Sequence, residues 1–204
     1  MKKIIFATQN KNKLVEIRQI LADFDVEIIS MADAGIDIEI DENGTTFEEN
    51  ALIKAETVGK VSHEIVLADD SGLSIDYLNG EPGIYSARYM GRDTSYDQKN
   101  ANLISRLDGV PDEKRTARFV CAVAAAFPDE PSQVVRGTIE GIIAHRPAGS
   151  KGFGYDPIFY VPEYGMTTAQ MTPEMKNSIS HRGKALRLIR PVIGAYLERH
   201  GESE

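Results

Sequence analysis

The sequence has little cysteine, no long apolar run and fewer basic than acidic residues. Its one cysteine, Cys121, cannot form an internal disulfide, which favours a reducing, cytoplasmic location. No window approaches the length of a membrane span. The apolar stretch that follows Met1-Lys2-Lys3 ends at Ala7, too early for a signal peptide. We therefore expect a soluble protein with no membrane partner.

The charge balance argues against a general nucleic-acid-binding protein. Lys and Arg number 23 against 31 Asp and Glu, a formal net charge of −8. A general nucleic-acid binder needs a basic face that displaces counterions from phosphates. We expect no nucleic-acid partner, and a polyanionic small ligand only where cations gather locally or a metal is bound.

What remains is typical of a globular protein, with 42% apolar and 26% charged residues and no repeat or low-complexity tract. A chain of 204 residues can bury a sizeable core, so we predict one domain over residues 1–204, with two lobes. Apolar periodicity predicts strands over 3–7, 26–30, 65–68, 117–127 and 133–144, and helices over 14–21, 47–61, 95–107, from 172 and from 181.

The most informative stretch is an apolar run, Ile65 to Ala68, that stops at Asp69, Asp70, Ser71 and Gly72. It predicts a buried strand that ends here and delivers both acids to the C-terminal edge of an α/β sheet, where ligands bind. Two adjacent acids at such an edge call for a cation. Asp, Ser and Gly are also ordinary turn formers, so a simple turn explains the stretch equally well.

Two further segments carry cations near the predicted ends of elements. Thr8 to Lys13 joins a strand to a helix, and its amides, ammonium groups and backbone N–H groups suit phosphate. It lacks the glycines of a P-loop, and helix capping by Asn10 or Asn12 explains it as well. The next helix opens with a Thr46/Glu49 capping box and carries Asn50 and Lys54 on one face, which an exposed polar face also explains.

The C-terminal third adds an aromatic residue and more cations. Gly152 and Gly154 flank Phe153, which frees the ring to stack on a flat partner; an aromatic-filled turn is the alternative. Thr172-Pro173 starts a short helix that carries Lys176. His181 and Arg182 begin the last helix, where cations oppose the helix dipole, so a ligand or an acid is expected nearby.

Acids for a metal, cations for phosphates and a ring for a base indicate nucleotide chemistry. Six segments, in order along nearly the whole chain, resemble the inosine triphosphate pyrophosphatase family, whose members are also called non-standard purine nucleoside triphosphate pyrophosphatases. These segments are 8–13, 46–55, 68–73, 82–88, 152–157 and 180–183.

The resemblance implies an α/β fold in which a long, bent mixed sheet floors a cleft between two lobes, and a homodimer. It implies Mg²⁺-dependent hydrolysis of ITP, dITP and XTP to the monophosphate and pyrophosphate, which cleanses the nucleotide pool. Asp70 is the implied catalytic group, with Asp69 as the other candidate for activating water, and Glu42 with Asp70 the implied metal ligands. The implied substrate contacts are Thr8, Gln9, Asn10, Lys11, Asn12, Lys13, Lys54, Ser71, Phe153, Gly154, Tyr155, Asp156, Lys176, His181 and Arg182.

One position departs from the family's pattern, because Gln9 stands where many relatives have a smaller residue. Two other functions remain open. A nucleotide sensor would bind the purine triphosphate without cleaving it. An aspartyl-phosphate phosphatase would use Asp69 or Asp70 as nucleophile, although such enzymes generally space their two acids one residue apart.

Overall fold

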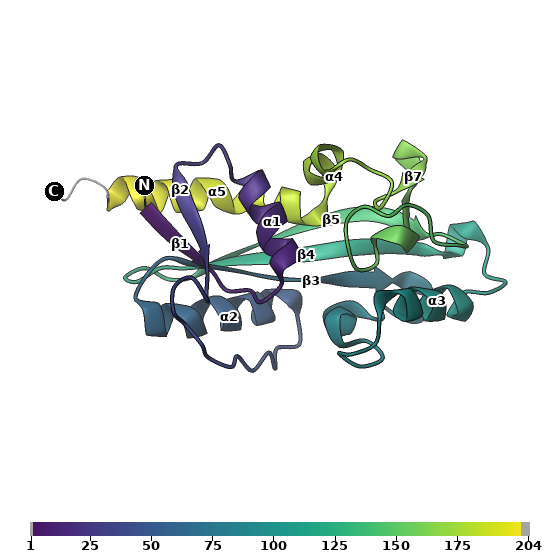
Figure 1. Ribbon diagram of the computed structural model, residues 1–204, viewed down its shortest axis with the longest axis horizontal. Helices are drawn as coiled ribbons and strands as arrows, with labels where there is room; N and C mark the ends of the chain where they lie inside the picture. The colour runs from purple at the N-terminus through teal and green to yellow at the C-terminus, as the bar shows by residue number, and fades with distance from the viewer. Residues whose placement is uncertain (1, 201–204) are drawn as a thin grey trace. The chain divides into compact units, whose positions relative to one another are not determined.

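The computed structural model describes residues 2–200, and Met1 and residues 201–204 lie outside the described part (Figure 1). The chain divides into two compact units. Unit 1 contains the residues up to Asp70, Cys121–Gly137 and the segment from His181 onward. Unit 2 contains Ser71–Val120 and Thr138–Ser180.

Seven strands form one sheet in the order β2-β1-β3-β4-β5-β6-β7. β1 pairs in parallel with β2 and β3, whereas β6 pairs antiparallel with β5 and β7. The sheet is therefore mixed, and the predicted α/β class is confirmed. The strands are β1 (Lys2–Phe6), β2 (Val26–Ser30), β3 (Val66–Ile75), β4 (Thr116–Ala126), β5 (Gln133–Ile143), β6 (Phe159–Val161) and β7 (Met166–Thr167).

The predicted helices are all present, and four of them begin where a polar side chain caps the helix. Asn10, Thr46, Ser95 and Thr172 each accept hydrogen bonds from backbone N–H groups of the first helical turn. The α-helices are α1 (Lys11–Ile20), α2 (Phe47–Ser62), α3 (Tyr96–Arg106), α4 (Pro173–Ile179) and α5 (His181–Arg199). Short 3₁₀ helices are η1 (Asp76–Leu78), η2 (Gly83–Arg88), η3 (Asp112–Lys114), η4 (Asp156–Ile158) and η5 (Pro162–Tyr164).

In unit 1, helices cover both faces of the strands (Figure 1). α1 and α5 pack on one face, where Ile17 and Leu186 join a core with Leu67 of β3 and Cys121 of β4. α2 packs on the other face, where Gly59 approaches Val66 and Ala126. Because side chains alternate along a strand, the odd-numbered residues in the unit 1 parts of β3 and β4 face α1 and α5, and the even-numbered ones face α2.

The predicted end of the central strand is wrong. β3 does not stop at Ala68 but continues as a strand through Asp69 and Asp70 to Ile75. The strand that ends at this level is its neighbour: β1 stops at Phe6, which pairs with Leu67. The two acids therefore lie just beyond the C-terminal end of β1, and the proposed turn closed by Gly72 does not form.

Unit 2 has its own core, which residues of β3, α3, β5 and β6 build, among them Leu73, Leu103, Ile139 and Phe159. Beside it, the buried guanidinium of Arg115 donates to the carbonyl oxygens of Leu107, Ile143 and Ala144 at 2.6–3.0 Å. Arg115 thus provides hydrogen bonds for carbonyl groups that would otherwise be buried without a partner, which is a structural role.

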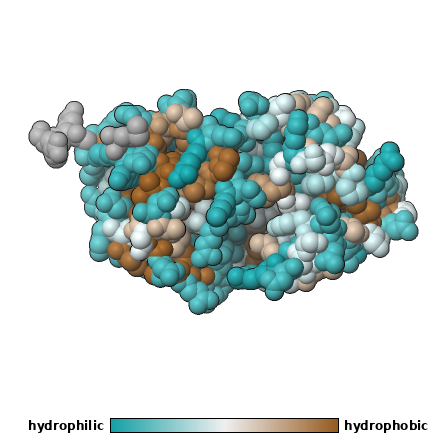
Figure 2. All heavy atoms as spheres, viewed as in Figure 1, coloured by the Kyte–Doolittle hydropathy of each residue, from teal (hydrophilic) through white to brown (hydrophobic). Residues whose placement is uncertain are grey.

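The surface shows no single large apolar face in the view of Figure 2, where hydrophobic residues lie in separate groups among hydrophilic ones. Within residues 2–200, no helix is long and apolar enough to cross a membrane. The large apolar side chains that are exposed come from different elements: Val15, Val61, Tyr77, Tyr85, Met90, Tyr96 and Leu188.

Two glycines of unit 1 give opposite predictions. A Cβ at Gly137 of β5 would lie 2.3 Å from the carbonyl oxygen of His181 and 2.6 Å from the nitrogen of Ala185, both backbone atoms of α5. We expect Gly137→Ala to destabilise the protein by about 1–3 kcal/mol, because backbone must move.

The matched control is Gly59→Ala inside α2, where the new Cβ would lie 3.4 Å from Ala126 Cβ, an ordinary contact. Alanine favours the helix by about 0.5–1 kcal/mol over glycine, so this variant is expected to be more stable. Urea denaturation measures both. Equal effects of the two substitutions would contradict the close packing of β5 on α5.

Candidate functional site

The strand geometry of β3 separates the two adjacent acids. Asp69 is odd-numbered and faces α1 and α5, whereas Asp70 is even-numbered and faces α2. Both are buried, with 1% and 8% of their surface exposed. Each acid therefore has its own set of partners, although one peptide bond joins them.

Asp69 is enclosed by cations. Its carboxylate lies 3.0 Å from the ammonium of Lys13 on α1 and accepts from the guanidinium of Arg182 on α5 at 3.4 Å. Cys121 Sγ lies 3.8 Å from the same carboxylate. Burial alone would raise the pKa of Asp69, but the charges of Lys13, Arg182 and Lys54 outweigh it and hold the pKa far below its usual value.

The same α1 also contributes Glu16, which sequence reasoning missed. Its carboxylate pairs with Arg182, so this guanidinium lies between two acids. The pKa of Arg182 is raised: burial opposes its charge, but Asp69 and Glu16 favour it more strongly. An acid was expected near Arg182 at the start of α5, and two acids, Asp69 and Glu16, are found there.

Asp70 has weaker partners. Asn50 of α2 donates an amide hydrogen bond to it at 3.2 Å, and the ammonium of Lys54, one helical turn further along, lies 3.7 Å away. Burial raises the pKa of Asp70, and these neighbours only partly offset it. Asp69 is thus a fixed anion, and Asp70 is the carboxylate with the greater affinity for a proton.

Lys54 also reaches the other predicted metal ligand. Its Nζ lies 2.9 Å from Glu42 Oε2, so Glu42 and Asp70 share one ammonium group. Burial opposes the charge on Lys54, but Asp70, Asp69 and Glu42 raise its pKa. Within residues 2–200, no group of three or more His, Cys, Asp and Glu side chains is arranged to hold a metal.

The loop before α1 is organised by its own side chains. Thr8 Oγ1 accepts from the Asn10 N–H, and Asn10 Oδ1 accepts from the N–H groups of Asn12 and Lys13. The capping interpretation of Asn10 is therefore confirmed. Gln9, Lys11 and Asn12 are exposed, and any role of theirs in binding phosphate remains a prediction.

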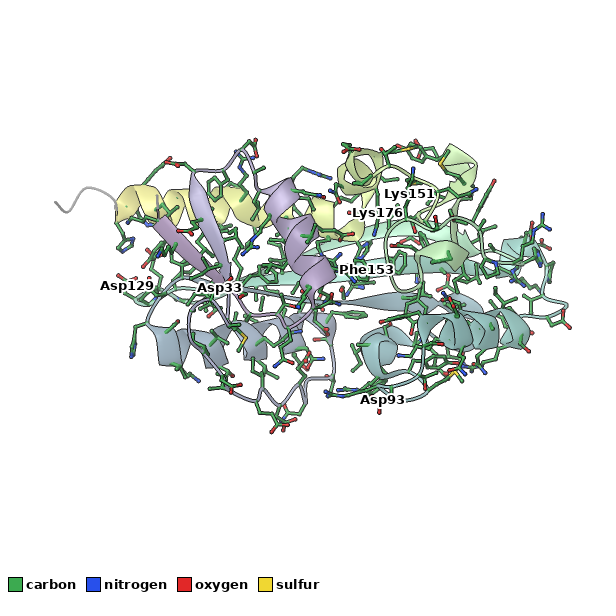
Figure 3. The ribbon with its side chains drawn as sticks, viewed as in Figure 1. Asp33, Asp93, Asp129, Lys151, Phe153 and Lys176 are labelled. Carbon is green, nitrogen blue, oxygen red and sulfur yellow. The ribbon has the colours of Figure 1, made fainter. Side chains whose placement is uncertain are left out.

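A second cluster lies in unit 2, around Asp156. This buried carboxylate accepts from Lys176 Nζ at 2.7 Å, from the Thr168 hydroxyl at 2.8 Å and from the Phe153 N–H at 2.8 Å. Lys176 Nζ also lies 5.0 Å from the centroid of the Phe153 ring, and Figure 3 shows the two side chains in the same region. The cluster thus contains a cation–π contact between the Phe153 ring and an ammonium group that Asp156 holds in place.

The glycines of this loop are required by its shape. Gly152 and Gly154 have φ of +72° and +67°, which favour glycine. A Cβ on Gly152 would lie 2.1 Å from Asp156 Oδ2. Tyr155 follows as a buried residue whose hydroxyl donates to the Ser86 carbonyl at 2.6 Å.

The predicted site residues divide between the two units. Unit 1 holds Lys13, Glu42, Lys54, Asp69, Asp70, Arg182 and the buried His181, the first residue of α5. Unit 2 holds Phe153, Gly154, Tyr155, Asp156, Lys176 and the half-buried Ser71 of β3. The additions are Glu16, Cys121 and Asn100, whose amide donates to the Gly154 carbonyl.

A mixed α/β sheet that carries a buried acid pair and lysines beside the C-terminal end of β1 defines a class of protein suited to a polyanionic ligand. The chain belongs to the Ham1 family, whose model matches residues 4–192. This confirms the family relationship that the six sequence segments indicate.

Similar proteins extend over the whole chain. The chain is 47% identical to a dITP/XTP pyrophosphatase of Listeria monocytogenes over 98% of both sequences, and 50% identical to one of Geobacillus kaustophilus over 91% of both. Among solved structures, the Ham1 protein of Staphylococcus aureus is 40% identical with a TM-score of 0.85 and covers 96% of this chain and 100% of its own. A HAM1 protein of Coxiella burnetii gives 40% and 0.86 at the same coverage.

The enclosed position of Asp69 gives a prediction for stability. Asp69→Asn keeps the shape of the side chain but turns an amide toward Lys13 and Arg182, which then lose a buried counter-charge. We expect a loss of about 3 kcal/mol in the free energy of unfolding, measured by urea denaturation.

Asp76→Asn is the matched control, because Asp76 pairs with Arg118 at the surface. An exposed pair contributes about 1 kcal/mol or less. If both substitutions cost the same, the buried charge network does not hold unit 1 together.

Proposed function

We propose that the protein hydrolyses the non-standard purine nucleoside triphosphates ITP, dITP and XTP to the monophosphate and pyrophosphate. The relatives that match it over nearly their full length are named dITP/XTP pyrophosphatases. The observation that carries the proposal is the arrangement of the two acids of β3: Asp69 lies between Lys13 and Arg182, whereas Asp70 shares Lys54 with Glu42.

This division supports Asp70 over Asp69 as the base. A general base must accept a proton from water, and Asp69 is poorly suited because Lys13 and Arg182 stabilise its charged form. Asp70 is paired less closely, with Asn50 at 3.2 Å and Lys54 at 3.7 Å, so of the two acids it is the better placed to accept a proton. We propose that Asp70 takes the proton of the water that attacks the α-phosphorus, and that Asp69 keeps Lys13 and Arg182 in place.

The donor set fits a magnesium ion. Mg²⁺ prefers oxygen ligands, keeps several waters and is commonly held by one or two carboxylates together with substrate phosphates. Glu42 and Asp70, which share Lys54, supply two such carboxylates in unit 1. When bound, the ion would neutralise charge on the phosphates and lower the pKa of a coordinated water. Glu42 and Asp70 are the residues that we propose hold it.

The charge of the unit 1 cluster supports this need for a cation. Its carboxylates, Glu16, Glu42, Asp69 and Asp70, outnumber its cations, Lys13, Lys54 and Arg182. A polyanionic triphosphate would be repelled by an acid-rich cluster unless a divalent ion joined it. With the ion bound, Lys13 and Lys54 are placed to stabilise charge on the phosphates and on the pyrophosphate that leaves.

We propose that the unit 2 cluster binds the purine. Phe153 offers a ring for stacking, and Lys176 is held on Asp156 beside it. Hypoxanthine and xanthine carry an oxygen at C6 where adenine carries an amino group, so a buried donor that faces C6 would be left unpaired by adenine. An unmade buried hydrogen bond costs about 1–3 kcal/mol, enough for a marked preference. A cytoplasmic homodimer remains part of the proposal.

The decisive experiment is product analysis over a panel of triphosphates, ITP, XTP, dITP, ATP and GTP, with Mg²⁺ and with EDTA. We expect pyrophosphate and monophosphate from the first three, little product from ATP and GTP, and none with EDTA. Stepwise release of orthophosphate would instead support an aspartyl-phosphate phosphatase. Tight binding of intact ITP for hours would support a nucleotide sensor.

Asp70→Asn tests the assignment of the base. The amide is isosteric but cannot accept the proton, so kcat for ITP is expected to fall by about 10²–10⁴-fold while the unfolding midpoint stays close to that of the parent protein. Asp76→Asn, at the surface beyond the end of β3, is the control and should leave kcat unchanged. Near-normal turnover of the Asp70 variant would remove Asp70 from this role.

A further inference from the structure

α3 of unit 2 buries polar side chains where a helix normally buries apolar ones. Tyr96, Lys99 and Asn100 are spaced three and four residues apart, so they share one face of α3. Lys99 and Asn100 are only 1% and 2% exposed. Burying an amine and an amide is unfavourable unless the protein provides hydrogen-bond partners for them.

These three side chains contact two loops. Lys99 Nζ donates to the Ala87 carbonyl of η2 at 2.9 Å, and burial lowers the pKa of this lysine. Tyr96 packs edge-on against Tyr155, with ring centroids 5.2 Å apart. Asn100 Nδ2 donates to the Gly154 carbonyl at 3.1 Å. Since a carbonyl oxygen only accepts, the atom that faces Gly154 must be the amide nitrogen.

The hydrogen bond from Asn100 is well placed to fix the backbone of the loop that carries Phe153. Gly154 lies between Phe153 and Tyr155 and has a left-handed φ of +67°. The Phe153 N–H is already fixed by Asp156 on the other side. The Phe153 backbone is therefore held at its nitrogen by Asp156 and, through the next residue's carbonyl, by Asn100.

Asn100 makes this contact at a cost to the fold. Its Oδ1 is buried and has no hydrogen-bond partner within residues 2–200. A buried acceptor left unpaired is costly, and a leucine of similar size would avoid it. The amide is therefore poorly explained by packing, and its one hydrogen bond, to the loop that carries Phe153, is the feature that explains it.

We infer that Asn100 is a positioning residue for the purine: by holding the Gly154 carbonyl, it orients the Phe153 ring on which the base stacks. The inference rests on the proposed function, because it assigns Asn100 to the purine end of that substrate. It predicts that Asn100 affects recognition of the base and leaves recognition of the phosphates unchanged.

The test is Asn100→Leu, which keeps the volume and removes both the bond to Gly154 and the unpaired acceptor. We expect KM for ITP to rise about tenfold, the equivalent of one lost hydrogen bond, with kcat little changed. The competitive inhibition constant of inorganic tripolyphosphate, which has no base, should not change. The melting temperature should stay the same or rise.

Asn102→Leu is the matched control. Asn102 lies on the same helix, and its Oδ1 accepts from the Tyr89 hydroxyl at 2.7 Å instead of contacting the loop. KM for ITP should stay at the parent value in this variant. Asn100→Asp is a second test, because its carboxylate would repel the Gly154 carbonyl and should raise KM at least as much as leucine does.

The outcomes distinguish a role of Asn100 from the proposed hydrolysis of ITP. An unchanged KM for ITP in Asn100→Leu, or a parallel weakening of tripolyphosphate inhibition, overturns the role of Asn100. A lower melting temperature with kcat and KM both impaired assigns Asn100 to the core instead. Failure of the parent protein to hydrolyse ITP overturns the proposed function, and calorimetric titration with inosine monophosphate then tests Asn100 directly: equal affinity of parent and variant ends the inference.

Discussion

The alternation of side chains along β3 is the constraint on which the rest of the site depends. Two adjacent carboxylates in a turn would compete for the same cations and repel each other. On a strand they point to opposite faces, so Asp69 meets Lys13 and Arg182 while Asp70 meets Asn50 and Lys54. The opposite pKa shifts of neighbouring residues follow from this separation, and with them the distinction between an anchoring acid and a reactive one.

The sequence predicted most elements because their signals are local. Helix caps at Asn10, Thr46, Ser95 and Thr172 and the apolar periods required no knowledge of distant residues. The end of β3 was misplaced because Asp, Ser and Gly are turn formers by propensity. Tertiary contacts with cations from α1, α2 and α5 override that propensity.

The site was predictable where one segment supplies a whole feature, as with the glycines around Phe153 or Asn50 and Lys54 on one face of α2. It was not predictable where the partner is distant in sequence. Glu16 and Arg182 are 166 residues apart, and Asn100 and Gly154 are 54 apart. Asn100 lies inside a helix with no local pattern that marks it, so only the fold reveals its role.

The charge network around Asp69 also has a consequence for biosynthesis. Its members come from α1, β3 and α5, so the last cation, Arg182, is translated long after Lys13 and Asp69 have left the ribosome. Until α5 has been synthesised, Asp69 can pair with Lys13 but not with Arg182, so burying its charge costs more. Unit 1 can therefore complete its core only once α5 has been synthesised and has packed on the sheet.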